Sequence, residues 1–373
     1  MIHRVLENVI AKHFFRGKAV IITGPRQVGK TTLVNRLSDL VGEKTLWING
    51  DEADTNDLLA NATSTRLKAL IGNNKLLVID EAQKISNIGL TLKLIIDNLK
   101  DIQVIVTGSS SLDIANHLNE PLTGRKFEYN LFPLSFGEMV SHTSELEESR
   151  LLEHRLVYGY YPDVVNNPGE EQKMIQLISN SYLYKDILAL EQIRKPVLVD
   201  KMLQALALQM GNEVSYNELG QLVGADKETI EKYIDLLEKS FVIFTLPSLN
   251  RNMRNELKKA KKIYFWDNGI RNAIIKNFNP LNLRQDVGAL WENFVITERI
   301  KFNHYRELYT NKWFWRTITQ QEIDFVEEYE GKLHAYEFKW NNDKVRFPKS
   351  FAEAYPDSEF RHITRKNFKE IIL

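Results

Sequence analysis

The sequence contains no cysteine among its 373 residues. This absence excludes disulfide bonds, thiolate zinc sites and cysteine nucleophiles, and it fits a reducing compartment. The chain also lacks an excess of charge of one sign, since 49 Lys and Arg balance 49 Asp and Glu. No global electrostatic field therefore draws the protein to nucleic acid, and any such binding must come from local patches.

Long hydrophobic runs are missing as well. The first ten residues, MIHRVLENVI, place Arg4 and Glu7 inside an apolar stretch, and no later run approaches the roughly 20 residues that span a bilayer. We therefore expect a cytoplasmic protein with no membrane association. The chain has no internal repeat or low-complexity segment, and its 43% hydrophobic residues are typical of a globular protein of several domains.

Short apolar runs alternate with helical patterns over residues 18–141. The predicted strands are KAVIIT, TLWIN, KLLVID and IQVIVTGSS, and helices are predicted from Gly29 and over LTLKLIIDNLK. Such alternation is typical of a mostly parallel sheet with helices on both faces. The sequence therefore predicts an α/β multidomain protein whose first domain covers residues 1–141.

The stretch ITGPRQVGKTTL follows the first predicted strand and opens a helix. It fits the pattern G-x-x-x-x-G-K-[ST], whose backbone N–H groups bind phosphate oxygens at the helix N-terminus. In this pattern Lys30 meets the β and γ phosphates, and the Thr31 hydroxyl holds Mg²⁺. The predicted ATP-binding residues of the loop are Gly24, Pro25, Arg26, Gln27, Val28, Gly29, Lys30, Thr31 and Thr32.

A second signature of a nucleotide site follows in LLVIDEA, an apolar strand that ends at Asp80 and Glu81. Asp80 is predicted to hold Mg²⁺ through water, and Glu81 to orient and activate the water that attacks the γ-phosphate. Another strand ends in VIVTGSSS, where Ser109 or Thr107 could sense the γ-phosphate. A hydroxyl at the end of a strand is, however, as often a helix cap.

Two predicted domains follow the first. Residues 142–195 are expected to form a helical lid or connector, which is broken by the turn YGYYPDVVNNPG. Residues 196–250 resemble a winged helix: Ser215 begins a capping-box pattern, Asp226 can cap a second helix, and FVIFTLP is the predicted wing strand.

The charges of this region leave its partner open between double-stranded DNA and a protein. The second helix, residues 227–239, carries three lysines against four acidic residues, whereas phosphate binding favours an excess of Lys and Arg. The basic run RNMRNELKKAKK, residues 251–262, has six cations against Glu256 and is the better candidate for a DNA contact.

The last predicted domain, residues 251–373, contains aromatic-rich strands around one helix, residues 288–300. Its segment EIDFVEEYEGKLHAYEFKW resembles the core of the PD-(D/E)xK nucleases, which place an acidic residue on a helix, an Asp on one strand and Glu-x-Lys on the next. The residues that match these positions are Glu292, Asp324, Glu337 and Lys339.

A hairpin that turns at Glu330 and Gly331 would pair residues whose numbers sum to 661, and would place Asp324 opposite Glu337. The next pair, 322 and 339, shares that face because residues two apart in a strand point the same way.

Mg²⁺ held by Glu292, Asp324 and Glu337 would relieve the repulsion between these acids, with Lys339 acting on a water or on the scissile phosphate. In the alternative, Lys339 pairs with Glu322, and the domain is a nuclease fold that is used only for binding.

The motifs together resemble a known family. GPRQVGKTT, LLVIDEAQ, VTGSSS and LTGRKFEYNLFPLSFGE are similar to those of AAA-type ATPases of bacteria and archaea that continue into a C-terminal domain of unassigned function. The resemblance extends through YGYYPDVV, KIYFWDNGI, ALWENFV and EIDFVEE…YEFKW. It implies a core with strand order 5-1-4-3-2 and an arginine that contacts the phosphate of a neighbouring subunit in a homo-oligomer. Arg125 is the candidate for this arginine, and its alternative role is a structural salt bridge.

Two functions are consistent with these motifs. The first is an Mg²⁺-dependent ATPase switch that acts on nucleic acid through the winged helix and the nuclease-like domain. The second is a regulatory ATPase whose C-terminal half recognises a protein partner.

Overall fold

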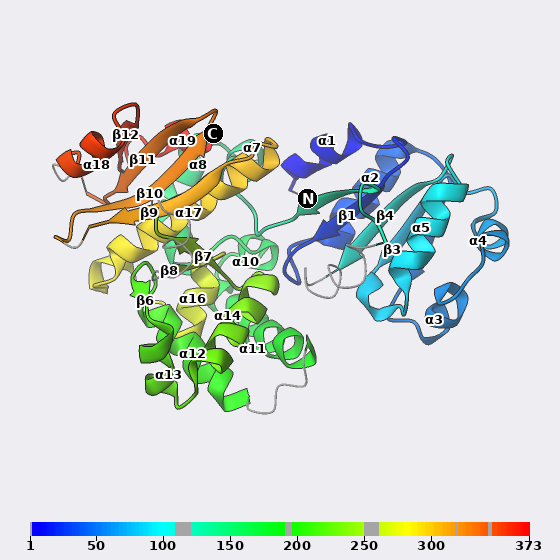
Figure 1. The fold of residues 1–373 in the computed structure, drawn as a ribbon, viewed down its shortest axis with the longest axis horizontal. Coiled ribbons are helices and arrows are strands. Elements are labelled where there is room, and N and C mark those ends of the chain that lie inside the picture. The colour runs from blue at the N-terminus through cyan, green and yellow to red at the C-terminus, as the bar shows by residue number, and fades with distance from the viewer. Residues whose placement is uncertain (1, 109–120, 191–195, 250–260, 318, 342–344) are drawn as a thin grey trace. The chain divides into compact units, whose positions relative to one another are not determined.

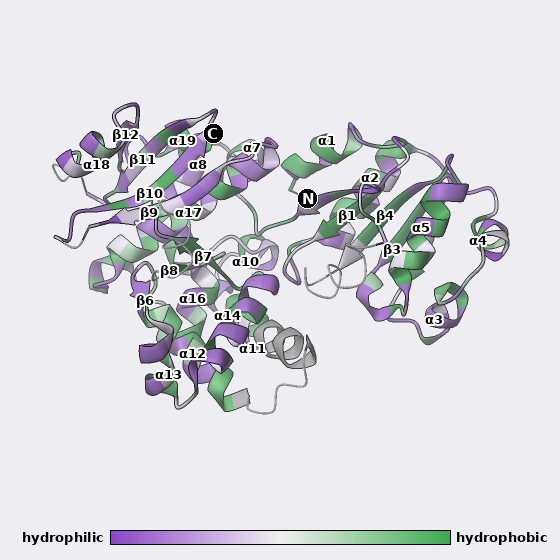
Figure 2. Ribbon diagram, viewed as in Figure 1, coloured by the Kyte–Doolittle hydropathy of each residue, from purple (hydrophilic) through white to green (hydrophobic). Residues whose placement is uncertain are grey.

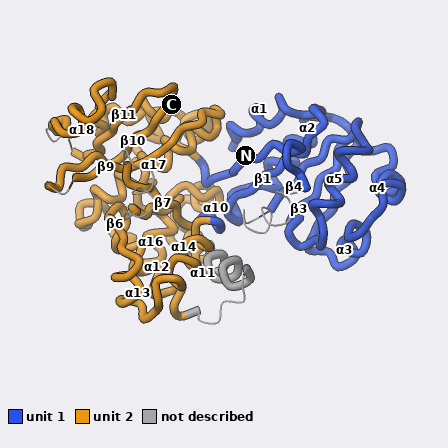
Figure 3. The backbone as a smooth tube through the Cα atoms, in the orientation of Figure 1, with its two compact units in different colours: residues 1–134, 239–241 blue, residues 135–238, 242–373 orange. Residues whose placement is uncertain are grey.

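The computed structural model describes residues 2–108, 121–190, 196–249, 261–317, 319–341 and 345–373 (Figure 1). The chain forms two compact units (Figure 3). Unit 1 comprises residues 1–134 and 239–241, and unit 2 comprises residues 135–238 and 242–373. Among the helices of the described ranges, none is long and apolar enough to cross a membrane.

Unit 1 is built on a five-stranded parallel sheet with the strand order β2-β3-β4-β1-β5. Figure 1 labels β1, β3 and β4 of this sheet. All residues of β1 and β4 are buried, as expected for parallel strands that are covered on both faces, and β1, β3 and β4 are largely hydrophobic (Figure 2). Read from β5, the order is 5-1-4-3-2, so the predicted order and the α/β fold are confirmed. The strands are β1 (Ala19–Thr23), β2 (Thr45–Asn49), β3 (Leu76–Asp80), β4 (Gln103–Gly108) and β5 (Lys126–Asn130).

Helices flank this sheet. The α2 helix buries Leu33, Val34 and Leu37, which recur at the helical spacing that gives it one apolar face. The predicted helices α2 and α5 are confirmed, whereas α1, α3 and α4 have only seven or eight residues and were not predicted. The helical elements of unit 1 are α1 (Val5–Ala11), α2 (Lys30–Val41), α3 (Ala53–Leu59), α4 (Ser64–Ile71), η1 (Ala82–Lys84) and α5 (Ile88–Asn98).

Unit 2 begins with helices. The predicted caps are confirmed: the Ser215 hydroxyl accepts the N–H of Glu218 at the start of α13, and Asp226 Oδ1 accepts the N–H of Thr229 at 2.7 Å in the first turn of α14. The helices are α7 (Phe136–His142), α8 (Glu145–Arg150), α9 (Leu152–Tyr158), α10 (Pro162–Asn166), α11 (Glu171–Leu190), α12 (Pro196–Leu208), α13 (Tyr216–Val223) and α14 (Lys227–Lys239).

A three-stranded antiparallel sheet follows, with β6 (Glu213–Val214), β7 (Ile243–Pro247) and β8 (Lys261–Phe265) in the order β6-β8-β7. The boundary predicted at residue 250 therefore falls between two strands that pair with each other. The pairing also corrects the interpretation of the basic run. Lys262 is only 2% exposed within β8 and cannot be a surface contact for DNA, while residues 251–260 lie outside the described residues.

The C-terminal part of unit 2 contains a four-stranded sheet in the order β12-β11-β10-β9. The predicted hairpin is confirmed: Tyr329 pairs with Lys332, and Glu330 and Gly331 form the turn with φ of +51° and +78°. The helix predicted over residues 288–300 lies within the longer α17. The elements are α16 (Asn268–Ile274), η2 (Leu281–Leu283), α17 (Val287–Tyr305), β9 (Asn311–Arg316), β10 (Glu322–Tyr329), β11 (Lys332–Phe338), α18 (Lys349–Ala354), β12 (Glu359–Ile363) and α19 (Lys369–Ile372).

Asp267 joins two sequence motifs of unit 2, YGYYPDVV and KIYFWDNGI. Its buried carboxylate accepts the N–H of Tyr160 at 2.7 Å and caps the first turn of α16. A Cβ on Gly159 would lie 2.1 Å from Asp267 Oδ1, and a Cβ on Gly269 would lie 2.1 Å from the Tyr158 carbonyl oxygen. The two glycines thus allow the backbone to approach this carboxylate, and the motifs have a structural role.

The substitution Asp267→Asn is expected to lower the free energy of unfolding of unit 2 by roughly 1 to 3 kcal/mol, because an amide nitrogen replaces one of the two buried acceptors. Urea unfolding monitored by the far-UV circular dichroism measures this change. The exposed Asp163, in α10, provides the control Asp163→Asn, which should change stability by less than about 0.5 kcal/mol. Equal unfolding midpoints for both variants would contradict the role given to Asp267.

Candidate functional site

The predicted phosphate-binding loop connects the carboxyl end of β1 to the start of α2. Gly24, Gln27 and Gly29 have positive φ values of 152°, 61° and 92°, and alternation into this region turns successive N–H groups toward an anion. A Cβ on Gly24 would lie 2.1 Å from the carbonyl oxygen of Leu131, so a larger residue does not fit there. The loop leads into a helix of 12 residues, whose N-terminus adds a favourable dipole for phosphate.

Lys30 lies over this loop. Its Nζ donates hydrogen bonds to the carbonyl oxygens of Gly24 and Pro25, both at 2.9 Å, and the residue is 7% exposed. The loop therefore combines a cationic group with a backbone that is shaped for anions, and these are the two features that bind a polyphosphate.

Thr31 and Asp80 meet at the carboxyl edge of the sheet. The Thr31 hydroxyl donates a hydrogen bond to Asp80 Oδ2 at 2.9 Å, and the Thr107 hydroxyl donates one to Asp80 Oδ1. Strand order explains the meeting, because β4 lies between β1 and β3 and all three strands end at this edge. Hydroxyl and carboxylate oxygens are hard ligands of the kind that Mg²⁺ prefers.

Glu81 follows Asp80 in a left-handed conformation with φ of 51°. Its N–H donates to Asp80 Oδ1 at 3.1 Å, and its carboxylate accepts a hydrogen bond from the side-chain amide of Gln83. The sequence analysis did not identify Gln83, although it stands two residues after Glu81 in LLVIDEAQ. Of the two hydroxyl residues predicted near the γ-phosphate, Thr107 lies beside Asp80, and Ser109 lies outside the described residues.

One loop residue, Val28, is held from the N-terminal segment. Arg4 Nη1 donates to the Val28 carbonyl oxygen at 2.7 Å, and Arg4 Nη2 donates to the Phe132 carbonyl oxygen at 2.6 Å. Arg26 is half-buried and Thr32 is exposed in the first turn of α2. Nothing in the local sequence around Arg4 links it to the loop, so this contact could not be predicted from the sequence.

Arg125 forms an ion pair on the surface of unit 1. Its Nε lies 2.7 Å from Asp97 Oδ1, and both side chains are about 40% exposed. The hydrogen bond from Arg125 lowers the pKa of Asp97 below its ordinary value. An ion pair of this kind is consistent with the alternative role of Arg125 as a salt-bridge partner.

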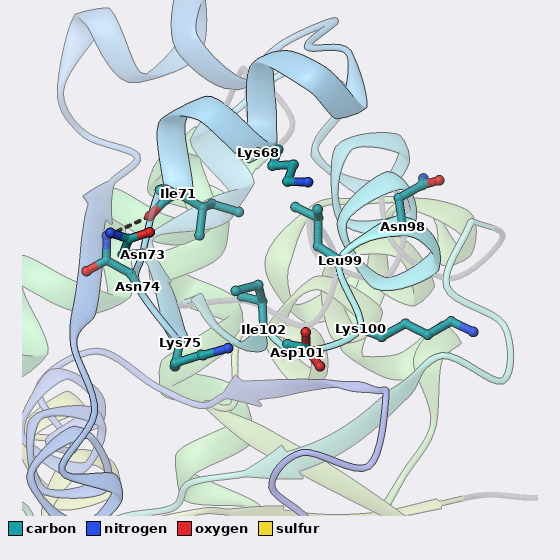
Figure 4. Close-up of a pocket in the computed structure, with 11 residues that line it drawn as sticks. Lys68, Ile71, Asn73, Asn74, Lys75, Asn98, Leu99, Lys100, Asp101 and Ile102 are labelled. Atoms are coloured by element: carbon teal, nitrogen blue, oxygen red, sulfur yellow. Dashed lines mark hydrogen bonds between the residues drawn. The ribbon is translucent and has the colours of Figure 1, made fainter.

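A cavity of about 400 Å³ opens at the opposite edge of the sheet (Figure 4). Lys75 and Ile102 precede β3 and β4, so the cavity lies at the amino ends of these strands, whereas the phosphate loop lies at the carboxyl ends. Lys68 and Lys100 line it with exposed side chains. The cavity is therefore separate from the predicted nucleotide site.

Unit 2 contains a second group of charged residues, which we call the carboxylate cluster. It is centred on Lys262 of β8, whose side chain is 3% exposed and whose Nζ lies 3.3 Å from Glu292 Oε1, 2.5 Å from Glu322 Oε1 and 4.0 Å from Asp324 Oδ1. The members of the cluster are Lys262, Glu292, Glu322, Asp324, Glu337 and Lys339.

The hairpin of β10 and β11 positions Asp324, Glu337 and Lys339 of the cluster. The predicted register is confirmed over the pairs that join residues 325–329 to residues 332–336, and Asp324 and Glu337 stand one position beyond the last of these pairs, so their direct opposition stays a prediction. Lys339 Nζ lies 2.7 Å from Glu337 Oε1 and 4.0 Å from Asp324 Oδ2. A one-residue shift in the pairing of β10 with β9 falls between Ile323 and Val326, while the pairs of β10 with β11 keep one register over residues 325–329.

The predicted alternative pairing of Lys339 with Glu322 is wrong, because Glu322 pairs with Lys262 instead. Burial and the neighbouring Glu292 raise the pKa of Asp324 to about 7, while Lys262 and Lys339 oppose the rise. Burial acts to lower the pKa of Lys262, but the surrounding carboxylates hold it above its ordinary value, so the ammonium stays charged. Within the described ranges, no group of three or more His, Asp or Glu side chains is arranged to hold a metal ion. The metal role of Glu292, Asp324 and Glu337 stays a prediction.

Family comparisons agree with this arrangement of unit 1. Residues 16–140 match the family model of an AAA domain. The matched segment contains the phosphate loop, Asp80, Glu81 and Arg125. Residues 149–281 and 287–368 match two domains of unknown function, DUF8612 and DUF4143 respectively.

Several proteins resemble most of the chain. It is 27% identical over 328 residues to an uncharacterized protein of Mycobacterium tuberculosis, which covers 87% of this chain and 70% of that protein. It is 22% identical over 389 residues to an uncharacterized protein of Methanocaldococcus jannaschii, covering 97% of this chain and 84% of that protein. Among solved structures, the RuvB Holliday junction branch migration motor of Thermotoga maritima is 14% identical and covers 69% of this chain and 95% of its own, with a TM-score of 0.34. This TM-score is too low to support an inference about function.

Proposed function

We propose that the chain binds Mg²⁺ and ATP in its AAA domain and hydrolyses the ATP slowly, as a nucleotide-driven switch. This proposal rests on the hydrogen bond of 2.9 Å from the Thr31 hydroxyl to Asp80 Oδ2, which lies beside the phosphate loop with its residues of positive φ. The loop N–H groups and Lys30 suit the phosphates, and the two oxygen ligands suit Mg²⁺ between them. Glu81 is adjacent to the metal carboxylate and is the proposed base for the attacking water.

Two substitutions separate binding from hydrolysis. Lys30→Ala should weaken ATP binding at least about tenfold, because the loop loses its charge. Glu81→Gln should leave the Kd for ATP within about threefold and lower the rate of phosphate release by about 100-fold or more, because the amide cannot accept a proton. Calorimetric titration with ATP and a phosphate-release assay measure the two effects.

The exposed Asp39 of α2 provides the control, since Asp39→Asn removes one carboxylate from the same domain and should change neither quantity. Equal rates of phosphate release in the wild type and in both site variants would refute the proposed hydrolysis.

We further propose that hydrolysis requires self-association, with Arg125 stabilising the charge that develops on the phosphate of a neighbouring subunit. Its exposed position supports this role, since a guanidinium that acts between subunits must be reachable. An arginine supplied in this way can raise the rate of phosphoryl transfer by about 10³-fold or more.

The pair Arg125 and Asp97 offers a matched test of that role. Arg125→Ala should lower the rate by at least about 100-fold without loss of ATP binding, and the wild-type specific activity should rise with protein concentration. Asp97→Ala breaks the same ion pair but keeps the arginine, so its rate should stay close to that of the wild type. If both substitutions have the same effect, the ion pair is structural and Arg125 has no role in hydrolysis.

For unit 2 we propose recognition of a protein partner through a winged helix formed by α13, α14 and the strands β7 and β8. The nucleic-acid partner expected from the sequence stays a prediction. The charges of the exposed side chains of α14 disfavour it. These side chains are two lysines and three acidic residues, Lys227, Glu228, Glu231, Lys232 and Asp235. Phosphate backbones bind surfaces with an excess of cations, and this one has a net charge of −1 (two minus three).

Fluorescence anisotropy with a labelled DNA duplex distinguishes the two partners. If unit 2 recognises protein, the full chain should show no binding that weakens with salt between about 50 and 200 mM, with or without ATP and Mg²⁺. A Kd that rises by orders of magnitude over this range would establish DNA as the partner and overturn the protein proposal.

A further inference from the structure

The carboxylate cluster of unit 2 contains its own cation. We propose that the ammonium of Lys262 occupies the position that a divalent metal ion would take between these carboxylates, so that Lys262 and a metal ion are alternative occupants of one site. In the arrangement observed, Lys262 excludes the metal. This inference rests on unit 2 alone and does not depend on the nucleotide site of unit 1.

The geometry around Lys262 is that of a bound cation. Its Nζ lies within 4.0 Å of carboxylate oxygens from Glu292, Glu322 and Asp324, which come from α17 and β10. The hydroxyl of Tyr264, two residues further along the same face of β8, donates to Glu292 Oε1 at 2.6 Å and fixes that carboxylate. Lys262 Nζ thus faces carboxylate oxygens from two elements, α17 and β10, at ammonium-to-carboxylate distances, and the ring of Phe314 lies 5.5 Å away.

The negative charges of Glu292, Glu322 and Asp324 explain why a cation is needed between them. Lys339 and Arg316 also neutralise the cluster, but their side chains are 38% and 33% exposed and lie at its edge. Lys262 is the buried cation among the described contacts of Glu292, Glu322 and Asp324. Without it these carboxylates would face one another in a region of low dielectric, where like charges repel strongly.

Divalent ions relieve such repulsion, and oxygen ligands from two or three carboxylates are the set that Mg²⁺ or Mn²⁺ accepts. An ammonium group supplies one charge and three donors, so it can satisfy the same oxygen atoms without a metal. The strand β8 that carries Lys262 pairs with β6 and β7, whereas the carboxylates belong to α17 and β10. Lys262 therefore also ties the three-stranded sheet to the C-terminal part of unit 2.

The test compares Mn²⁺ binding by the full chain and its variants without nucleotide, followed by electron paramagnetic resonance. Lys262→Met should bind about one Mn²⁺ ion per chain at the cluster, and wild type should bind the ion there at least about tenfold more weakly. This binding should disappear in the double variant Lys262→Met, Asp324→Asn, which keeps Thr31 and Asp80 and so reports any ion bound in unit 1. Lys261→Met, at the neighbouring position of β8, is the matched control and should behave as wild type.

The inference is overturned if folded Lys262→Met binds no more Mn²⁺ than the double variant, or if wild type binds the ion at the cluster as tightly as Lys262→Met does. If Lys262→Met does not fold stably, the melting temperatures of the variants provide a second test. If repulsion between the carboxylates destabilises Lys262→Met, the double variant Lys262→Met, Asp324→Asn should recover much of the lost melting temperature, because it has one carboxylate fewer. If the double variant is as unstable as Lys262→Met while Lys261→Met is stable, packing rather than charge explains Lys262, and the inference is again overturned.

Discussion

The parallel sheet of unit 1 requires β1, β3 and β4 to end at one edge, and the candidate nucleotide site depends on that requirement. The phosphate loop follows β1, Asp80 is the last residue of β3, and Thr107 is the last residue but one of β4, so residues far apart in sequence meet at this edge. Gly24 allows the backbone of Leu131 to approach the loop, and Arg4 holds the loop by a hydrogen bond to the Val28 carbonyl oxygen.

Unit 2 depends on a different kind of constraint, which is the neutralisation of buried charge. Lys262 is placed among carboxylates of α17 and β10, and Asp267 accepts backbone N–H groups that would otherwise be buried without a partner. Both residues connect segments that are distant in sequence. A site that resembles a metal-dependent nuclease can therefore serve as a structural ion cluster, because a fold match does not establish an activity.

The sequence predicted the features whose signal is local. The loop pattern, the strand ending at Asp80, the caps of α13 and α14 and the hairpin turn at Glu330 and Gly331 each occupy a few adjacent residues. The role of Lys262 could not be predicted this way, since it appeared as one cation of a basic run and its burial follows from the pairing of β8 with β7. Strands β5 and β12, KFEYN and EFRHI, are too polar to be recognised by hydrophobicity, and only their pairing in the sheets identifies them.

The most direct test of the central claim is a double-mutant cycle on Thr31 and Asp80, read as the ATP affinity with and without Mg²⁺. Wild type should bind ATP at least about tenfold more tightly with Mg²⁺, Thr31→Ala and Asp80→Asn should each lose most of this gain, and the double variant should lose little more, because both residues serve one ion. An affinity that is independent of Mg²⁺ in the wild type, or effects of the two substitutions that simply add, would contradict a shared metal site.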